Sequence, residues 1–249
     1  KGWESFCVSS QCGCGFGCKF CATGAIGHKR NMTADEITDQ ILYFYLAGHQ
    51  INSVSFMGMG EPFANPNLFD ALKILTNPSL FGLSQRRITI STIGMIPGIK
   101  RLTRDFPQVN LAFSLHSPFE KQRSELMPIN QTYPLHKVMD ALDAHVANTK
   151  RRLFLAYIML GGINDSAEHA KALAHLILSR GALSYLYHVD LIPYNATDKT
   201  ARKFTASNHE AIKNFSDILH SNRISVAIRM QFGSDIGAGC GQLYADERD

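Results

Sequence analysis

The sequence predicts an α/β fold whose parallel sheet curves into an open, partial (β/α)6 TIM-like barrel. Short β-branched or aromatic runs alternate with helical patterns along the whole chain, which is typical of a parallel sheet with right-handed crossovers. The strand–helix repeats number roughly six, against eight in a closed barrel. The 249 residues are 45% hydrophobic and 18% charged, so the chain can bury one sizeable core and does not have a disordered composition.

The predicted strands define the repeats. They are residues 5–10, 52–57, 87–92, 109–114, 152–159, 185–192 and 224–230. No linker, low-complexity stretch or charge run separates them, so residues 1–249 are expected to form one domain. The chain starts at Lys1 without an initiator methionine, and we expect an upstream domain to be absent from it.

The helix signals lie between these strands. The clearest covers residues 33–47, where Thr33 and Glu36 have the spacing of a capping box and apolar residues recur at helical spacing. Gly48 then supplies a stop signal. Two later pairs with capping-box spacing predict further helix starts: Asp165 with Glu168, and Ser207 with Glu210.

Composition limits the classes of function. No apolar run approaches about 20 residues, so a membrane span is not expected. The formal net charge of +4 permits a nucleic-acid partner without requiring one. Three basic residues near the cysteine-rich segment, Lys19, Lys29 and Arg30, are the best candidates for phosphate contacts.

The cysteine spacing is the strongest chemical signal. Five of the six cysteines crowd the first 21 residues, and Cys240 stands alone. This crowding argues against three disulfides in a chain large enough to have a core. Cys14, Cys18 and Cys21 offer three ligands without a second pair, which favours an iron–sulfur cluster with one open iron over a closed zinc site. Cys12 could be a fourth ligand, although the spacing of Cys14, Cys18 and Cys21 already provides three ligands without it.

Other polar or glycine-rich motifs follow the predicted strands. Barrels of this kind place their chemistry in the loops at the carboxyl ends of the strands. We therefore expect the motifs to meet at one mouth. They are the cysteine segment 14–21, residues 58–62, Ser91, residues 114–116, residues 193–195 and the loop of Cys240.

These motifs resemble those of the radical S-adenosylmethionine (SAM) superfamily and, more specifically, of the RlmN/Cfr family of RNA adenine methyltransferases. The resemblance spans residues 5–243 and is carried by residues 7–24, 58–62, 113–116, 127–130 and 239–243. Residues 11–17, 24–27, 35–40 and 231–236 are similar to the branch that methylates carbon 8 of adenine. Pro62 instead follows the branch that methylates carbon 2.

The resemblance implies an activity and a set of site residues. The activity is methylation of carbon 8 of an adenosine in the peptidyl transferase centre of 23S ribosomal RNA, which confers resistance to phenicols, lincosamides, oxazolidinones, pleuromutilins and streptogramin A. A 4Fe–4S cluster would be held by Cys14, Cys18 and Cys21, and two SAM molecules would be used per turnover. SAM would be contacted by Gly60, Glu61, Ser91, Ser114, Leu115, His116 and Asn195.

By the same resemblance, Cys240 would carry the methyl group as a methylcysteine. Cys7 would assist proton removal and then close a transient disulfide with Cys240. The partners implied are 23S rRNA, with tRNA added in the carbon-2 alternative, and a reductant such as flavodoxin or ferredoxin. The protein would act in the cytoplasm as a monomer and would not associate with a membrane.

Three alternatives stay open at this point. The first is the carbon-2 methyltransferase. The second is a radical SAM activase, which would need the cluster but not Cys240. The third is a non-catalytic, zinc-stabilised RNA-binding module. In addition, His116 on its own could equally be a buried core histidine.

Overall fold

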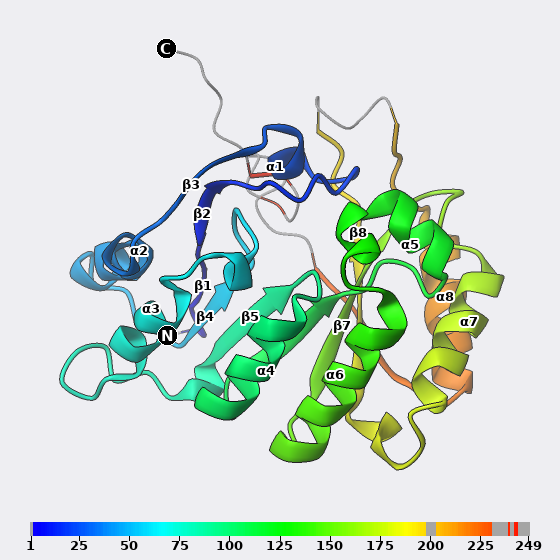
Figure 1. Ribbon diagram of the computed structural model, residues 1–249. Coiled ribbons are helices and arrows are strands. Elements are labelled where there is room, and N and C mark those ends of the chain that lie inside the picture. The colour runs from blue at the N-terminus through cyan, green and yellow to red at the C-terminus, as the bar shows by residue number, and fades with distance from the viewer. Residues whose placement is uncertain (1, 198–202, 231–238, 240–241, 244–249) are drawn as a thin grey trace.

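The chain forms one curved parallel sheet of seven strands (Figure 1). The computed structural model describes residues 2–197, 203–230, 239, 242 and 243. The strand order is β1-β4-β5-β6-β7-β8-β9, with bounds β1 (Ser5–Cys7), β4 (Ser53–Phe56), β5 (Ile88–Thr92), β6 (Asn110–Ser114), β7 (Leu153–Met159), β8 (Tyr187–Pro193) and β9 (Ser225–Ile228). Every neighbouring pair is parallel. The predicted open α/β barrel is confirmed.

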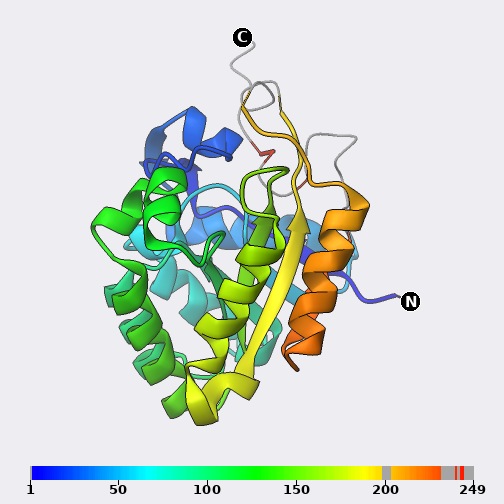
Figure 2. The same ribbon diagram turned by 90° about the vertical axis from the view of Figure 1, so that its right-hand side faces the viewer.

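Helices cover the outer face of this sheet (Figures 1 and 2). The longer ones are α2 (Ala34–Leu46), α3 (Leu68–Thr76), α4 (Ile96–Asp105), α6 (Leu135–Thr149), α7 (Ala167–Leu178) and α8 (His209–Ser221). The short elements are α1 (Ala22–Ala25), α5 (Glu120–Leu126), η1 (Pro62–Ala64), η2 (Gln85–Arg87), η3 (Pro128–Gln131) and η4 (Gly181–Leu186). Among the described helices, none has the length and apolar content needed to cross a bilayer.

The core lies between the sheet and the helices. In β5, Ile88, Ile90 and Thr92 are buried, whereas the alternate residues Thr89 and Ser91 are half-buried. This alternation follows from the two-residue period of a strand, which sends one set of side chains to the helices and the other into the barrel. The inner wall can therefore carry polar side chains without disturbing the core.

The predicted helix 33–47 is confirmed with its capping box. The Thr33 hydroxyl accepts from the Glu36 backbone N–H at 3.2 Å, and the Glu36 carboxylate accepts from the Thr33 N–H at 2.9 Å. Gly48 follows the helix with a φ of +86°, a conformation that glycine adopts without a steric penalty. The local sequence therefore sets both ends of α2.

The other two predicted helix starts are wrong by one residue. The cap of α8 is Asn208 rather than Ser207, because its side-chain oxygen accepts from the Ala211 N–H at 2.8 Å. The cap of α7 is Ser166 rather than Asp165, and its hydroxyl accepts from the His169 N–H. In both cases the adjacent polar residue has the extended backbone that a cap needs.

The predicted strand 5–10 is also shorter than expected, since it ends at Cys7. Beyond this point the chain leaves the sheet, and the Ser10 and Gln11 N–H groups both donate to the Met59 carbonyl at 3.0 and 3.2 Å. It then forms β2 (Gln11–Gly13), which pairs antiparallel with β3 (His28–Asn31). This small sheet lies above the carboxyl end of the main sheet (Figure 1) and holds the cysteine segment there.

Candidate active site

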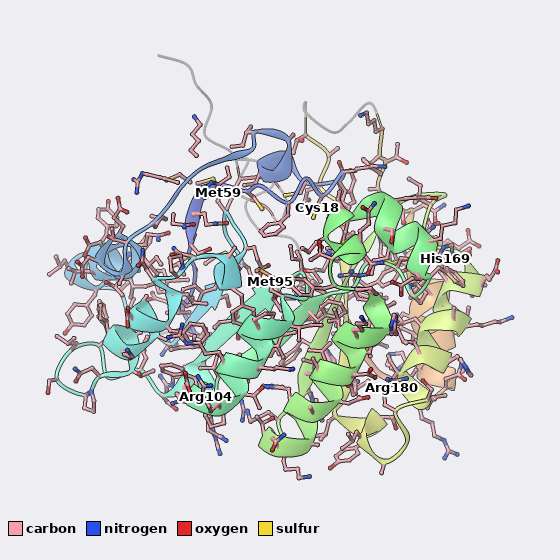
Figure 3. All side chains as sticks on the ribbon, in the orientation of Figure 1. Cys18, Met59, Met95, Arg104, His169 and Arg180 are labelled. Atoms are coloured by element: carbon pink, nitrogen blue, oxygen red, sulfur yellow. The ribbon has the colours of Figure 1, made fainter. Side chains whose placement is uncertain are left out.

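Two adjoining cavities lie at the carboxyl end of the sheet. The first, the cysteine cavity, has a volume of about 150 Å³ and is lined by Cys14, Cys18 and Cys21. The second, the sheet cavity, has a volume of about 170 Å³ and extends over the inner wall from Ser91 to Asp190. Gly60, Glu61, Ser114 and His116 line both cavities. Figure 3 shows Cys18 and Met59 at this end of the molecule, opposite Arg104 and Arg180.

The cysteine segment is held by backbone hydrogen bonds at both ends. The Cys14 N–H donates to the Gly27 carbonyl at 2.9 Å, and the Lys19 N–H donates to the Leu126 carbonyl of α5 at 3.0 Å. Phe20 packs edge-on against His116 with ring centroids 4.9 Å apart. The loop thus closes one side of both cavities, and its three predicted ligand thiols face the same space.

Two of these thiols are held in the protonated form in the apoprotein. Burial raises the pKa of Cys14 to about 11 and raises the pKa of Cys18 further, and neighbouring thiols add to both shifts. Thiolates gathered there therefore need positive charge, which iron would supply. No disulfide joins two of the five described cysteines.

Glu61 is a buried carboxylate at the wall that the two cavities share. It accepts from the Thr92 hydroxyl at 2.6 Å, from the Ile93 N–H at 2.9 Å and from the Phe63 N–H at 3.3 Å. Burial raises its pKa to about 7 against the opposing effect of these hydrogen bonds. None of the ion pairs among the described residues includes Glu61. A ligand ammonium would supply the cation that this site lacks.

Gly60 is required by the fold beside this carboxylate. Its φ is +96°, and a methyl group there would approach the Gln11 side chain to 2.6 Å. The same Gln11 side chain accepts from the Glu61 N–H at 2.9 Å. The glycine therefore lets β2 pack closely on the loop after β4 and fixes the backbone that carries Glu61.

His116 is both a buried, hydrogen-bonded histidine and a cavity residue. Its Nδ1 accepts from the Ile158 N–H at 3.0 Å, and its carbonyl accepts from the Asn164 amide at 2.8 Å. Burial, and secondarily the charge of Arg123, lowers its pKa to about 3. Because Nδ1 accepts, the neutral ring carries its proton on Nε2. His116 can therefore offer one fixed N–H donor.

The remaining predicted SAM contacts differ in position. The hydroxyl oxygens of Ser91 and Ser114 lie 3.5 Å apart on the inner wall. The Leu115 side chain is fully buried in the main core, and its N–H donates to Ala156, so Leu115 could contact a ligand only through its backbone. Asn195 is buried and lines neither cavity.

Of the two predicted catalytic cysteines, Cys7 is exposed at the carboxyl end of β1 and lines neither cavity. Cys240 lies outside the described residues. The residues near it are informative, because a methyl group on Gly239 would lie 2.8 Å from the Asn195 amide nitrogen. Leu243 lines the cysteine cavity, and its carbonyl accepts from the Thr23 hydroxyl.

The structure adds residues that the sequence motifs do not include. Asp190 and Arg229 form an ion pair of 3.3 Å on the wall of the sheet cavity. Asp190 could have been found as the one charge within an otherwise apolar strand segment. Arg123 is completely buried beneath the cavities, yet its surrounding sequence, Glu-Lys-Gln-Arg-Ser-Glu-Leu, has the composition of an exposed helix.

Two other predictions concern the segment around β2. Arg30, a candidate phosphate contact, donates from both terminal guanidinium nitrogens to the Glu36 carboxylate at 2.7 and 2.8 Å. This exposed ion pair would have to open before Arg30 could bind RNA. Cys12 lies in β2 and lines neither cavity. This position agrees with a cluster held by the other three cysteines of the segment.

Comparison with known proteins identifies close relatives. Residues 8–177 match the model of the radical SAM superfamily. The chain is 74% identical to a protein of Lachnoclostridium phytofermentans named ribosomal RNA large subunit methyltransferase Cfr, over 99% of this chain and 72% of that protein. A protein of the same name from Staphylococcus warneri is 58% identical, over 98% of this chain and 70% of its own length.

Solved structures show the same architecture. A radical SAM methyltransferase from Sphaerobacter thermophilus superposes with a TM-score of 0.88 at 41% identity, over 95% of this chain and 69% of that one. The hydrogenase maturase HydG from Carboxydothermus hydrogenoformans superposes with a TM-score of 0.65 at 13% identity, over 90% of this chain and 52% of that one. The second similarity concerns the fold alone.

Proposed function

Because the chain belongs to the radical SAM superfamily and, within it, to the Cfr ribosomal RNA large subunit methyltransferases, we propose that it methylates carbon 8 of an adenosine in the peptidyl transferase centre of 23S rRNA. This modification would confer resistance to phenicols, lincosamides, oxazolidinones, pleuromutilins and streptogramin A. The observation that carries the proposal is the juxtaposition of the three cluster thiols with the buried, cation-free Glu61 in one pair of cavities.

The residues present fit a 4Fe–4S cluster and SAM. Cys14, Cys18 and Cys21 would hold the cluster, and Glu61 would accept from the SAM ammonium group. Once bound, the cluster supplies the electron that converts SAM into a carbon radical. Polar contacts to SAM at the neighbouring wall would come from the hydroxyls of Ser91 and Ser114 and from the Nε2–H of His116. Asn195 would contact SAM from its position next to Gly239.

Radical chemistry suits this substrate. Carbon 8 of adenine lies between two ring nitrogens, and its hydrogen is not acidic, so an ordinary polar methyl transfer lacks a nucleophile. We infer that the Cys240 thiolate takes the methyl group from a first SAM by substitution. With a second SAM bound, the radical chemistry of the site would remove a hydrogen atom from the S-methyl group. The methylene carbon would then bond to carbon 8, and the unpaired electron left on the ring would return to the cluster.

Cys7 would complete the reaction. It would take the proton from the modified ring carbon. The Cys7 thiolate would then attack the Cys240 sulfur and form a disulfide, which breaks the bond from that sulfur to the methylene carbon, and this carbon would take up a proton as the methylated base leaves. Gly239, which precedes Cys240 in the sequence, lies beside Asn195, and Leu243 lines the cysteine cavity. Flavodoxin or ferredoxin would supply the electrons, and the enzyme would act on RNA in the cytoplasm as a monomer.

The relatives also bear on the alternatives. Those compared above carry a methyltransferase name, which favours neither an activase nor a non-catalytic zinc module. A carbon-2 enzyme would produce a different nucleoside, so product analysis separates the two methyltransferases.

The test is mass spectrometry of nucleosides from the 23S rRNA of cells that express the protein. We expect 8-methyladenosine with the native chain and none with Cys240→Ala, while Cys12→Ala keeps the modification. Detection of 2-methyladenosine alone would assign the carbon-2 reaction instead. Unmodified RNA from cells whose protein carries a full cluster would contradict the proposal.

A further inference from the structure

Arg123 carries a buried positive charge that is held entirely by neutral groups. Its side chain is fully buried on α5. It donates to the carbonyls of Leu115 at 3.1 Å, Ile93 at 2.9 Å and Ser114 at 3.1 Å, and to the side-chain oxygen of Asn130 at 2.5 Å. None of the described carboxylates forms an ion pair with it. A guanidinium buried in this way has its hydrogen bonds satisfied by neutral groups, and the Glu120 carboxylate is linked to it only through the Asn130 side chain.

The position of Arg123 connects this charge to the cysteine segment. The Arg123 carbonyl accepts from the Met127 N–H at 2.7 Å, and Met127 lines the cysteine cavity. The Leu126 carbonyl of the same helix accepts from the Lys19 N–H, and Cys18 packs against the apolar cluster that contains Leu126 and Met127. Arg123 therefore lies in the element that supports the cysteine segment from behind.

The electrostatic interactions agree with this arrangement. Burial lowers the pKa of Arg123 to about 10, and the thiol of Cys18 is the first group that opposes this shift. Arg123 in turn counteracts the rise in the pKa of Cys18 that burial causes. Arg123 thus stays charged at neutral pH, and the groups that raise its pKa against the effect of burial are Cys18, a predicted cluster ligand, and Glu120.

A purely mechanical role would not require this charge. The hydrogen bonds of Arg123 join the ends of β5 and β6, and they could serve only as a clamp. However, burying an ion has a desolvation cost of several kcal/mol, which a neutral amide in a clamp would largely avoid. The Ile93 and Ser114 carbonyls that hold the guanidinium belong to residues that line the cysteine cavity, so the charge lies directly behind the predicted cluster site.

We propose that Arg123 supplies a fixed positive charge that makes the cluster easier to reduce. This inference rests on the proposed function, because it requires the cluster on Cys14, Cys18 and Cys21. Reduction adds one electron from an external donor to a site that already contains three thiolates. A buried cation with little solvent screening stabilises the more negative, reduced state and so raises the reduction potential.

The test is a redox titration of the reconstituted holoenzyme, followed by the electron paramagnetic resonance signal of the reduced cluster. With Arg123→Gln, which removes the charge, we expect the ratio of reduced to oxidised cluster at a fixed potential to fall about tenfold, equivalent to about 59 mV. Arg123→Lys keeps the positive charge but loses the several N–H donors of the guanidinium. With this variant the reduction potential of the cluster should stay near that of the native protein. Arg151→Gln removes a guanidinium that binds Asn110 and should have no effect.

A second variant avoids removing Arg123. The Asn130 amide donates to the Glu120 carboxylate at 2.9 Å. The double variant Asn130→Asp with Glu120→Gln therefore places a carboxylate directly beside the Arg123 guanidinium and keeps the net charge of the protein. The potential should become more negative in this double variant also. It serves as the deciding measurement if Arg123→Gln fails to bind iron.

The outcomes separate this inference from the proposed function. If the native protein binds no cluster, the proposed function fails. If the native protein binds the cluster and methylates RNA, but the charge-removing variants keep the native potential, only the role of Arg123 is overturned. In that case an equal loss of SAM affinity in Arg123→Gln and Arg123→Lys would identify a clamp.

Discussion

The Thr92 hydroxyl donates to Oε1 of Glu61 at 2.6 Å, and both side chains are buried. Thr92 is the last residue of β5, whereas Glu61 follows β4. The neighbouring strand therefore fixes the orientation of the carboxylate, and the Ile93 N–H holds the second oxygen at 2.9 Å. A carboxylate positioned in this way needs little reorganisation to receive an ammonium group.

We expect Glu61→Gln to weaken SAM binding by the holoenzyme at least tenfold, which corresponds to about 1.4 kcal/mol. The substitution keeps the size of the side chain and removes the charge that would pair with the ammonium group. Thr92→Val should cause a smaller loss, because the carboxylate stays but one of its orienting bonds is removed. Equilibrium dialysis with labelled SAM measures both effects. Glu168→Gln, at an exposed site on α7, is the control, and native affinity in Glu61→Gln would refute the assignment.

Replacing any one of Cys14, Cys18 and Cys21 by alanine should abolish stable cluster binding. Each thiol lines the cysteine cavity, and three thiolates are the minimum set expected for a cluster with one open iron. The measurement is iron and sulfide content with the visible absorption spectrum after anaerobic reconstitution. Cys12→Ala provides the matched control, since Cys12 is close in sequence but lines neither cavity. Loss of iron in Cys12→Ala with retention in Cys18→Ala would reverse the assignment.

The fold and the site could be predicted to different extents from the sequence. Periodicity and caps are local signals, so the strands of the sheet and the capping box of Thr33 and Glu36 were predictable. The departure of the chain from the sheet after Cys7 was not, because it depends on contacts with Met59, some 50 residues away. The buried position of Arg123 could not be predicted either, since its partners Ile93 and Ser114 lie at the ends of β5 and β6, which are distant in the sequence.

The site residues show the same limit. Motif spacing predicted that Cys14, Cys18, Cys21 and Glu61 lie at one end of the sheet, and they line one cavity there. It could not show that the Leu115 side chain points into the core, because a strand residue next to a site can face either side. Nor could it pair Asp190 with Arg229, which requires knowing that β8 and β9 are neighbours.

The interior strand β7 should contribute strongly to stability. Leu155 is fully buried there and pairs with Phe113 of β6 and Val189 of β8. Leu155→Ala should lower the free energy of unfolding by about 2–5 kcal/mol, because it removes buried methyl groups and leaves a cavity. Urea denaturation of the apoprotein measures the change. Leu178→Ala, at a leucine that is 47% exposed, should cost less than about 0.5 kcal/mol; equal losses at the two sites would contradict this account of the core.

Stability should also fall in acid through His145, which is buried on α6 with Nδ1 2.8 Å from the Thr103 hydroxyl. Burial, and secondarily the charge of Arg151, lowers its pKa from 6.5 to about 4. Between these values the unfolded chain binds more protons than the folded protein. The contribution of the neutral ring is therefore complete above pH 6.5 and is lost as the pH falls through 4.

The loss due to His145 should amount to roughly 2–3 kcal/mol by linkage. His145→Leu keeps an apolar side chain at the buried position and removes the titrating group, so the free energy of unfolding should decline less between pH 6.5 and 4 than in the native chain. Urea denaturation across this range provides the measurement. His136→Leu removes an exposed imidazole from the same helix and should reproduce the native pH dependence. If His145→Leu also follows the native curve, another group must cause the acid sensitivity, because the buried ring would then contribute no differential proton binding.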